Sequence, residues 1–467
     1  MFFAGSTTKS FTAAAAAQLI ESNATDSYGH QVSWTTRLSD LIRDDFVLTD
    51  EYATSHITIE DALSHRTGMP RHDISWINGN PSVREQVRQL RYLPLHNELR
   101  TTWEYCNLMF TSISHAVETV LKRPMSAIFG DIWKSIGMNE TVYNLDEAII
   151  LADEIDTTVA RAYLYNNATK SQVLTYWSDV PPANGAGGII SNVLDYTKWL
   201  HFLMHADSES GPISVNSVKA MTSPHMIMPG DWRPYKGQYY GFGLEGGIYR
   251  DHLVLEHSGG IAGYMANMLW LPELEWGIVT MQNTYSFAQS VIAYALVDDF
   301  LGLKDKDRFN AAAAVKKIEA EKMDKLQHDA IRKRLWPDAP SEPLAPSLPL
   351  EAYEGTYHHP AYQNISIFLL SHDQTEEESL QPSYREDQRD ERLLHFLPMP
   401  GSYLSLSGTF HHVSGEHWYA HMVMGQSWIT DEVMKAEFRV GYDGKVAGLK
   451  LQAEPSMDEL SWFRKVD

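Results

Sequence analysis

Three short groups of residues in this sequence carry side chains that could do chemistry. The first is Ser6-Thr7-Thr8-Lys9. Positions three apart on a helix share a face, so the Ser6 hydroxyl and the Lys9 amine can meet. Serine is a weak nucleophile until a neighbour takes its proton, and a desolvated lysine can do this because burial disfavours its charged form. The alternative is an ordinary helix start in which Ser6 caps the helix and Lys9 is solvated, and this pattern alone leaves both open.

The second group is Tyr105-Cys106-Asn107. In an extended segment, residues i and i+2 point the same way, so Tyr105 and Asn107 can face one cleft. A phenol beside an ammonium group loses its proton more readily and can carry it between nucleophile and leaving group. Residues 165–167 repeat the same Tyr-x-Asn pattern, and a structural, half-buried tyrosine is the alternative for Tyr105.

The third group is His257-Ser258-Gly259-Gly260, at the end of a β-prone run. His257 and the bare backbone at Gly259 would line one strand edge. An accessible backbone amide beside a glycine is what an oxyanion hole requires. The alternative is a strand that ends in a glycine turn next to a surface histidine.

The elements that must position these groups follow from hydrophobic patterning. Residues 6–21 predict one helix that is apolar nearly all round and therefore buried. Residues 57–65 predict a helix entered through Thr58, and residues 191–205 predict an amphipathic helix after the glycine turn at 185–188. Four β-prone runs then predict consecutive antiparallel strands at 239–244, 252–257, 264–271 and 277–282. The fold class expected for this part is α+β, an antiparallel sheet flanked by helices.

The remainder of the chain changes in composition. A charged, Ala-rich helix is expected from about residue 310 to 335, and five prolines then mark a stiff, extended segment. Residues 350–467 alternate aromatic and polar residues, which favours an all-β, barrel-like domain. We therefore expect a first domain at 1–335, a proline-rich linker at 336–349 and a β domain at 350–467.

Composition excludes several function classes. The chain of 467 residues carries a net charge of −22, whereas nucleic acid and anionic membranes select positive charge. No apolar run approaches the roughly 20 residues that span a bilayer. The single cysteine, Cys106, excludes an intramolecular disulfide framework. A small-molecule partner is therefore expected, with no nucleic acid and no membrane span, and the sequence assigns no compartment.

The order Ser-x-x-Lys, Tyr-x-Asn, His-x-Gly resembles the β-lactamase and penicillin-binding-protein superfamily of serine hydrolases. It is most similar to the branch related to class C β-lactamases, which also holds esterases, D-amino-acid-specific peptidases and acyltransferases. Further phrases resemble the same branch: ITIEDALSHRTGMPRHD (57–73), LRTTWEYCNLMF (99–110), GAGGIISNVLDYTKWL (185–200) and EHSGGIAGYMANMLWLPELEWGIVTMQN (256–283). The tail, opening with GTYHHPAY (355–362), resembles the lipocalin-like C-terminal domain of some relatives.

The resemblance implies a role for each group. Ser6 would attack a carbonyl carbon of an ester, amide or peptide, and Lys9 with Tyr105 would handle its proton. The backbone amides of Ser6 and Gly260 would hold the oxyanion. The residues implied to contact the substrate or the Lys9–Tyr105 pair are Asn107, His257, Ser258 and Gly259. No cofactor and no metal is implied, because the paired histidines at 358–359 and 411–412 lack ligand spacing.

Two departures qualify the resemblance. Relatives carry a helix and two sheet strands before the serine motif, so the N-terminal strands of the sheet are expected to be missing here, with residues 1–5 as the end of one. An uncovered sheet edge favours pairing with another chain, hence self-association. His257 stands where a lysine helps a β-lactamase to hold its substrate's carboxylate, which favours an esterase, peptidase or acyltransferase over an efficient β-lactamase. The alternative function is a catalytically impaired, penicillin-binding-like binding or sensory module.

Overall fold

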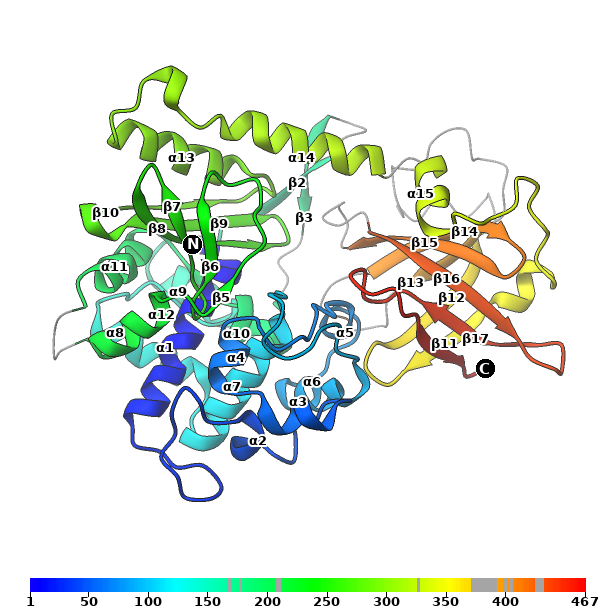
Figure 1. Ribbon diagram of the computed structural model, residues 1–467, viewed down its shortest axis with the longest axis horizontal. Helices are drawn as coiled ribbons and strands as arrows, with labels where there is room; N and C mark the ends of the chain where they lie inside the picture. Colours follow the sequence, from blue (N-terminus) through cyan, green and yellow to red (C-terminus); the bar gives the residue numbers. More distant parts are fainter. Residues whose placement is uncertain are drawn as a thin grey trace. The chain divides into compact units, whose positions relative to one another are not determined.

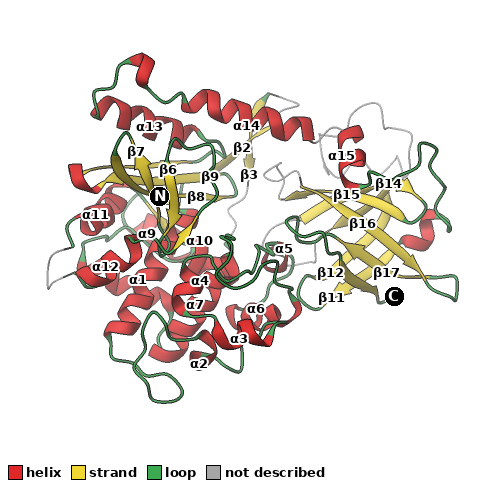
Figure 2. Cartoon of the chain, in the orientation of Figure 1, coloured by secondary structure: helices red, strands yellow, loops and turns green. Residues whose placement is uncertain are grey.

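The chain forms two compact units in the computed structural model (Figures 1 and 2). The model describes residues 1–467 except 167–169, 176–178, 207–210, 326–327, 371–392, 398–401, 403–405 and 425–431. The first unit comprises residues 1–71, 81–163 and 176–316, and the second comprises 72–80, 164–175 and 317–467. This division differs from the boundaries expected at 335 and 350, because two short segments of the N-terminal half pack with the barrel. The limits of separately folding domains stay a prediction.

A six-stranded antiparallel sheet organises the first unit. Its order is β10-β9-β8-β7-β6-β5, so the strands from β6 to β10 are neighbours in sequence as well as in space. Among the described strands, β10 pairs only with β9. The strands are β5 (Met226–Ile227), β6 (Lys236–Tyr240), β7 (Glu245–Tyr249), β8 (His252–Ile261), β9 (Tyr264–Leu271) and β10 (Trp276–Gln282). Of the strand expected at 239–244, only residues 239–240 lie in a strand, at the end of β6, and residues 241–244 form the turn that leads into β7.

Helices cover both faces of this sheet. The helix α13 (Ala288–Phe300) packs along one face, where Tyr294 and Val297 join buried Val254 and Leu269 in an apolar cluster. The helix α11 (Val193–Met204) packs on β9 and β10 from the other face. This layered arrangement confirms the α+β class expected from the sequence.

The N-terminal helix is buried as expected, but its first turn is tighter than an α-helix. A 3₁₀ turn, η1 (Gly5–Thr7), precedes α1 (Thr8–Glu21). Phe11 stacks on Trp199 of α11 with 4.3 Å between ring centroids. The strand expected at residues 1–5 is present as β1 (Phe2–Phe3), but it pairs with β4 (Ile190–Ser191) and not with the six-stranded sheet.

Several of the remaining helices begin at a residue whose side chain caps them. Thr58 caps α4 in a capping box with Asp61, as the sequence predicted for a helix entered at this residue. Among the described residues no helix is long and apolar enough to cross a membrane. The other helices are α2 (Leu38–Leu41), α3 (Glu51–His56), α4 (Ile59–Leu63), α5 (Ile74–Ile77), α6 (Val83–Gln89), α7 (Asn107–Leu121), α8 (Met125–Ser135), α9 (Leu145–Glu154), α10 (Asn184–Gly187), α12 (Val215–Thr222), α14 (Ala311–Lys325) and α15 (His328–Leu335).

The second unit is built on a closed eight-stranded antiparallel barrel, which confirms the all-β C-terminal domain. Phe438 lies fully buried in it, with Tyr353, Tyr357, Phe410 and Trp418 around its ring. The barrel strands are β11 (Gly355–His359), β12 (Gln363–Leu370), β13 (Leu393–Leu397), β14 (Leu406–Ser414), β15 (His417–Met424), β16 (Glu432–Val440), β17 (Val446–Leu451) and β18 (Ser461–Lys465), and a separate hairpin pairs β2 (Ala162–Asn166) with β3 (Ser171–Thr175).

Candidate active site

Ser6 and Lys9 meet at the start of the buried N-terminal helix. The Lys9 side chain is fully buried, and its Nζ lies 3.1 Å from Ser6 Oγ. Ser6 itself keeps partial exposure, so a substrate can approach its hydroxyl. The alternative in which Lys9 is solvated is therefore wrong, because the side chain has no contact with solvent. An amine buried in this way needs hydrogen-bond partners inside the protein.

Two further oxygens hold the Lys9 amine. Lys9 Nζ donates to Asn107 Oδ1 and to the Ala186 carbonyl oxygen, each at 2.8 Å. A neutral amine has two N–H groups and one lone pair, so these two acceptors leave the lone pair directed at the Ser6 hydroxyl. An ammonium group would satisfy the same three contacts by donating to all of them.

Tyr105 lies beside this pair with its ring among charged and aromatic groups. Lys9 Nζ is 4.7 Å from the Tyr105 ring centroid, and Arg71 Cζ is 5.0 Å from it. The His65 ring is 4.3 Å away, centroid to centroid. The two basic side chains therefore lie over the face of the Tyr105 ring in cation–π contact. Tyr165, in the repeated Tyr-x-Asn pattern, lies in β2, and residue 167 is outside the described residues.

The glycines of the third group let β8 approach the Ser6 turn. The strand β7 pairs with β8 only as far as Glu256, so the next residues of β8 present a free edge. A Cβ at Gly259 would lie 2.0 Å from the Ala4 carbonyl oxygen and 3.0 Å from Ser6 N. A Cβ at Gly5 would lie 2.7 Å from Gly260 N. Only glycine fits at positions 5 and 259, where η1 packs against β8. This close packing places the backbone amides of Ser6 and Gly260 beside the contact between the two segments.

His257 lies on this strand but does not contact Lys9 through a described hydrogen bond. Its Nδ1 lies 2.6 Å from the Ser258 carbonyl oxygen, and its Nε2 lies 2.8 Å from Tyr240 Oη. A carbonyl only accepts, so Nδ1 carries the proton and Nε2 accepts from the Tyr240 hydroxyl. Burial, opposed in part by Glu245, lowers the pKa of His257 to about 4. The imidazole is therefore neutral at pH 7, with both nitrogens engaged.

Ser258 is placed differently from its neighbours. By strand alternation its side chain lies on the opposite face of β8 from His257, where it is exposed and lines a cavity.

The structure thus joins Ser6, Lys9 and Asn107 by hydrogen bonds and places Tyr105, Gly259 and Gly260 around them.

Several residues of the site were not singled out from the sequence. Ala186 supplies only a carbonyl oxygen, from α10 in the glycine turn, and carries no side-chain signal. His65 is fully buried, and burial with nearby Lys9 lowers its pKa well below the ordinary value. His65 and Arg71 both fall in the phrase 57–73 that carried the family resemblance. Tyr240 had no signal beyond its place in a β-prone run.

Comparison with known proteins assigns both parts of the chain. The family model described as Beta-lactamase matches residues 1–299, and a domain of unknown function (DUF3471) matches residues 339–465. An unguisins hydrolase of Aspergillus campestris is 32% identical over 480 residues, covering 100% of this chain and 83% of that protein. Another, of Aspergillus violaceofuscus, is 33% identical over 494 residues and covers 100% and 82%.

Solved structures share the fold at low sequence identity. The octameric penicillin-binding-protein homologue from Pyrococcus abyssi superposes with a TM-score of 0.56 and 17% identity, covering 100% of this chain and 88% of that one. A D-amino acid amidase from Ochrobactrum anthropi SV3, complexed with L-phenylalanine amide, gives 0.51 and 19% over 68% of this chain and 84% of that one. The family match and the two fungal relatives lead to one conclusion: the chain belongs to the Beta-lactamase family.

Proposed function

We propose that this chain is a serine hydrolase that cleaves amide or ester bonds through an acyl-enzyme on Ser6. The observation that carries the proposal is the buried Lys9 amine, 3.1 Å from Ser6 Oγ. Because Asn107 Oδ1 and the Ala186 carbonyl occupy its other two positions, the lone pair of a neutral amine would face the serine hydroxyl. A helix start without a catalytic role would not need an amine held in this way.

The proposed reaction has two halves. In the first, Ser6 Oγ attacks the substrate carbonyl carbon while its proton passes to Lys9, and the amides of Ser6 and Gly260 donate to the oxyanion. The tetrahedral intermediate collapses when the leaving amine or alcohol takes a proton from the Lys9–Tyr105 pair. In the second half, water attacks the acyl carbon and gives its proton to the same pair. The bond between the acyl carbon and Ser6 Oγ then breaks, Oγ takes the proton back from the pair, and the acid is released.

Amide substrates are supported by the relatives, whose names are unguisins hydrolase and D-amino acid amidase. We propose amides, with esters as easier substrates of the same site. His257 supports the exclusion of efficient β-lactamase activity. A neutral imidazole whose two nitrogens are engaged within the protein offers a substrate carboxylate no charge.

Labelling of the nucleophile tests the proposal directly. A fluorescent fluorophosphonate should modify Ser6, as mapped by peptide mass spectrometry, and Ser6→Ala should abolish both labelling and turnover of p-nitrophenyl acetate. Ser10→Ala is the matched control, because Ser10 Oγ donates to the Thr7 carbonyl inside the same helix. Labelling that persists in Ser6→Ala would overturn the assignment. One round of acylation without release would instead support the binding-module alternative.

We also propose that copies of the chain self-associate. The support is the sheet edge at β10, which among described strands pairs only with β9, and the octameric state named for the Pyrococcus abyssi homologue. Light scattering after size-exclusion chromatography decides this, and a mass of one chain, 53.0 kDa, at all concentrations would contradict it.

A further inference from the structure

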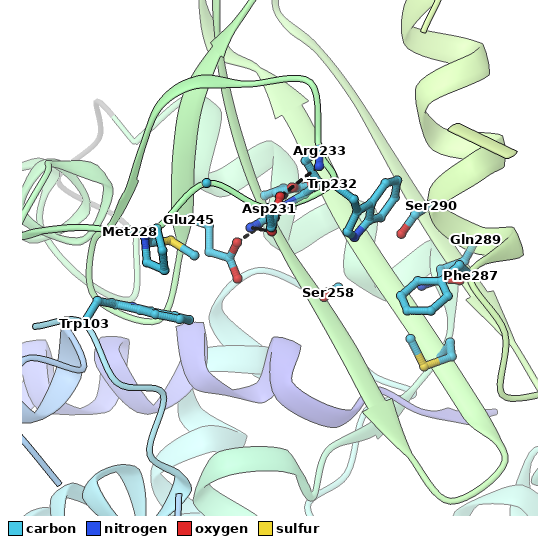
Figure 3. A pocket seen from close by; sticks show the side chains of 14 residues that line it. Trp103, Met228, Asp231, Trp232, Arg233, Glu245, Ser258, Phe287, Gln289 and Ser290 are labelled. Atoms are coloured by element: carbon cyan, nitrogen blue, oxygen red, sulfur yellow. Dashed lines mark hydrogen bonds and ion pairs between the residues drawn. The ribbon is translucent and has the colours of Figure 1, made fainter. Parts of the chain in front are cut away.

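A cavity of about 270 Å³ opens in the first unit on the α13 side of β8 (Figure 3). The apolar part of its wall is formed by aromatic and thioether side chains: Trp103, Trp232, Phe287, Met228 and Met265. Such walls accept large apolar or aromatic groups. None of these residues belongs to the catalytic groups described above.

This cavity begins at the residues that frame Ser6. Ser258, which lines it, directly precedes the glycines that cross the Ser6 turn. Met265 also lines it, and a Cβ at Gly260 would lie 2.9 Å from Met265 Sδ. On another wall, the Trp103 ring lies 6.1 Å from the Tyr105 ring, centroid to centroid. Lining residues of the cavity thus neighbour the glycines at the Ser6 turn and the Tyr105 ring.

Gln289 supplies an unusual polar group on its wall. The side chain is 2% exposed, and neither its Nε2 nor its Oε1 has a hydrogen-bond partner among the described residues. A buried amide left unpaired costs about 1–3 kcal/mol. Since it offers one donor group and one acceptor side by side, its best complement is another amide, which offers the same pair.

The charged residues that line the cavity favour uncharged ligands over anions. Arg233 forms ion pairs with three carboxylates: Asp231 at 2.7 Å, Glu256 at 2.7 Å, and Glu245. Glu245 and Glu256 lie directly opposite each other on β7 and β8, and burial raises the pKa of Glu256. The guanidinium contributes one positive charge. When at least two of the three carboxylates are ionised, the net charge of this cluster is therefore negative. A substrate carboxylate would be repelled there.

We propose that this cavity is a substrate subsite that binds an uncharged amide group together with a large apolar or aromatic side chain, the amide pairing with Gln289. The inference deepens the proposed function and rests on it, since it names peptide-like amides as the substrates that Ser6 meets. The apolar walls hold the side chain, Gln289 orients the neighbouring amide, and the carboxylates around Arg233 exclude chain ends that carry a free carboxylate.

Binding measured without turnover tests this subsite separately from catalysis. In a Ser6→Ala background, titration calorimetry should detect binding of N-acetyl-phenylalaninamide, with both enantiomers tried. Gln289→Leu should weaken binding about tenfold, the effect expected of one lost amide pairing. Gln89→Leu, which removes another amide with an unpartnered oxygen outside the cavity, is the matched control and should bind as the parent does.

Each outcome has a definite reading. Equal affinities of the two leucine variants, or no binding of either enantiomer to the parent, would overturn the subsite. Tighter binding of N-acetyl-phenylalanine, which carries a free carboxylate, would overturn the role of the acidic cluster. If Gln289→Leu melts below the parent, the isosteric Gln289→Glu variant decides, because it loses the donor while keeping the shape. Turnover of p-nitrophenyl acetate by wild type but not by Ser6→Ala would show that the proposed function holds even where the subsite fails.

Discussion

At the scale of single residues, the neutral imidazole of His257 and its two hydrogen-bond partners are a central feature of the site. Tyr240 donates to His257 Nε2, and His257 donates through Nδ1 to the Ser258 carbonyl. This chain of hydrogen bonds fixes the end of β8 beside the glycines. His257 therefore acts as a positioning residue in our proposal, and Lys9 is the nearest group that can take the Ser6 proton.

Lys9 and Tyr105 are expected to work as one proton-transfer unit. Lys9→Ala and Tyr105→Phe should each lower kcat/KM by about 10²–10⁴-fold, the usual range for general acid–base groups. The double variant should lose no more than the larger single loss, because each residue is useful only with the other. Lys198→Ala is the control, since Lys198 Nζ also holds a backbone carbonyl, that of Gly137, away from Ser6. Additive losses in steady-state kinetics would contradict shared work.

His257 should also make the protein sensitive to acid. The folded state holds its pKa at about 4, below the ordinary 6.5, so between these values the unfolded chain binds a proton that the folded chain does not. Its stabilising contribution is complete above pH 6.5 and is lost as the pH falls towards 4. By linkage, about 2–3 kcal/mol of unfolding free energy is lost on going from pH 7 to 4.5.

Urea unfolding of His257→Gln at both pH values measures this contribution. The variant should lose about 2–3 kcal/mol less than wild type over the same pH interval. His30→Gln, at a histidine whose side chain is 78% exposed, should behave as wild type does. Equal pH dependence of wild type and His257→Gln would show that His257 is not the group responsible.

At the scale of elements, the site depends on how closely β8 and η1 pack. A Cβ at Gly259 would meet backbone atoms of Ala4 and Ser6, which can make room only if the turn that contains them moves. We expect Gly259→Ala to fold but to shift the Ser6 turn, and a shift near 1 Å can lower the rate about 100-fold. Gly130→Ala in α8 is the control, because nothing lies within 4 Å of its added methyl group. Circular dichroism establishes folding, and unchanged kcat/KM for Gly259→Ala would contradict the argument.

Local patterns predicted several helices and strands of the first unit and the all-β nature of the C-terminal part, whereas features set by contacts between distant segments were missed. Apolar periodicity and the Thr58 cap gave the helices near their observed ends. The hydrophobic pattern of the sequence could not predict that the Ala186 carbonyl accepts from Lys9, because these two distant residues meet only through tertiary packing. The same holds for residues 72–80: Asn78 Nδ2 donates to the Tyr362 carbonyl at 2.8 Å, which joins this segment to the second unit.

At the scale of the whole molecule, every residue to which we assign a catalytic role lies in one unit. Ser6, Lys9, Tyr105, Asn107 and Gly260 all belong to the first. The barrel is stabilised by its own aromatic core. The segment 72–80 interrupts the first unit in sequence, so removing the barrel by truncation would also strip the partners of Asn78. A substitution inside the barrel is therefore a cleaner probe than a deletion.

Phe438→Ala should separate the barrel's stability from the chemistry at Ser6. Phe438 is fully buried among four aromatic rings, and truncating such a side chain costs about 3–5 kcal/mol of unfolding free energy. Because no catalytic group in our proposal comes from the barrel, kcat/KM for p-nitrophenyl acetate should stay within about twofold, well inside 1 kcal/mol. Tyr442→Ala, at a fully exposed tyrosine of the same unit, should change neither quantity. Calorimetric melting and ester kinetics on the three proteins measure both effects. A large loss of kcat in Phe438→Ala, at a temperature where the variant is still folded, would show that the second unit supplies a group to the reaction.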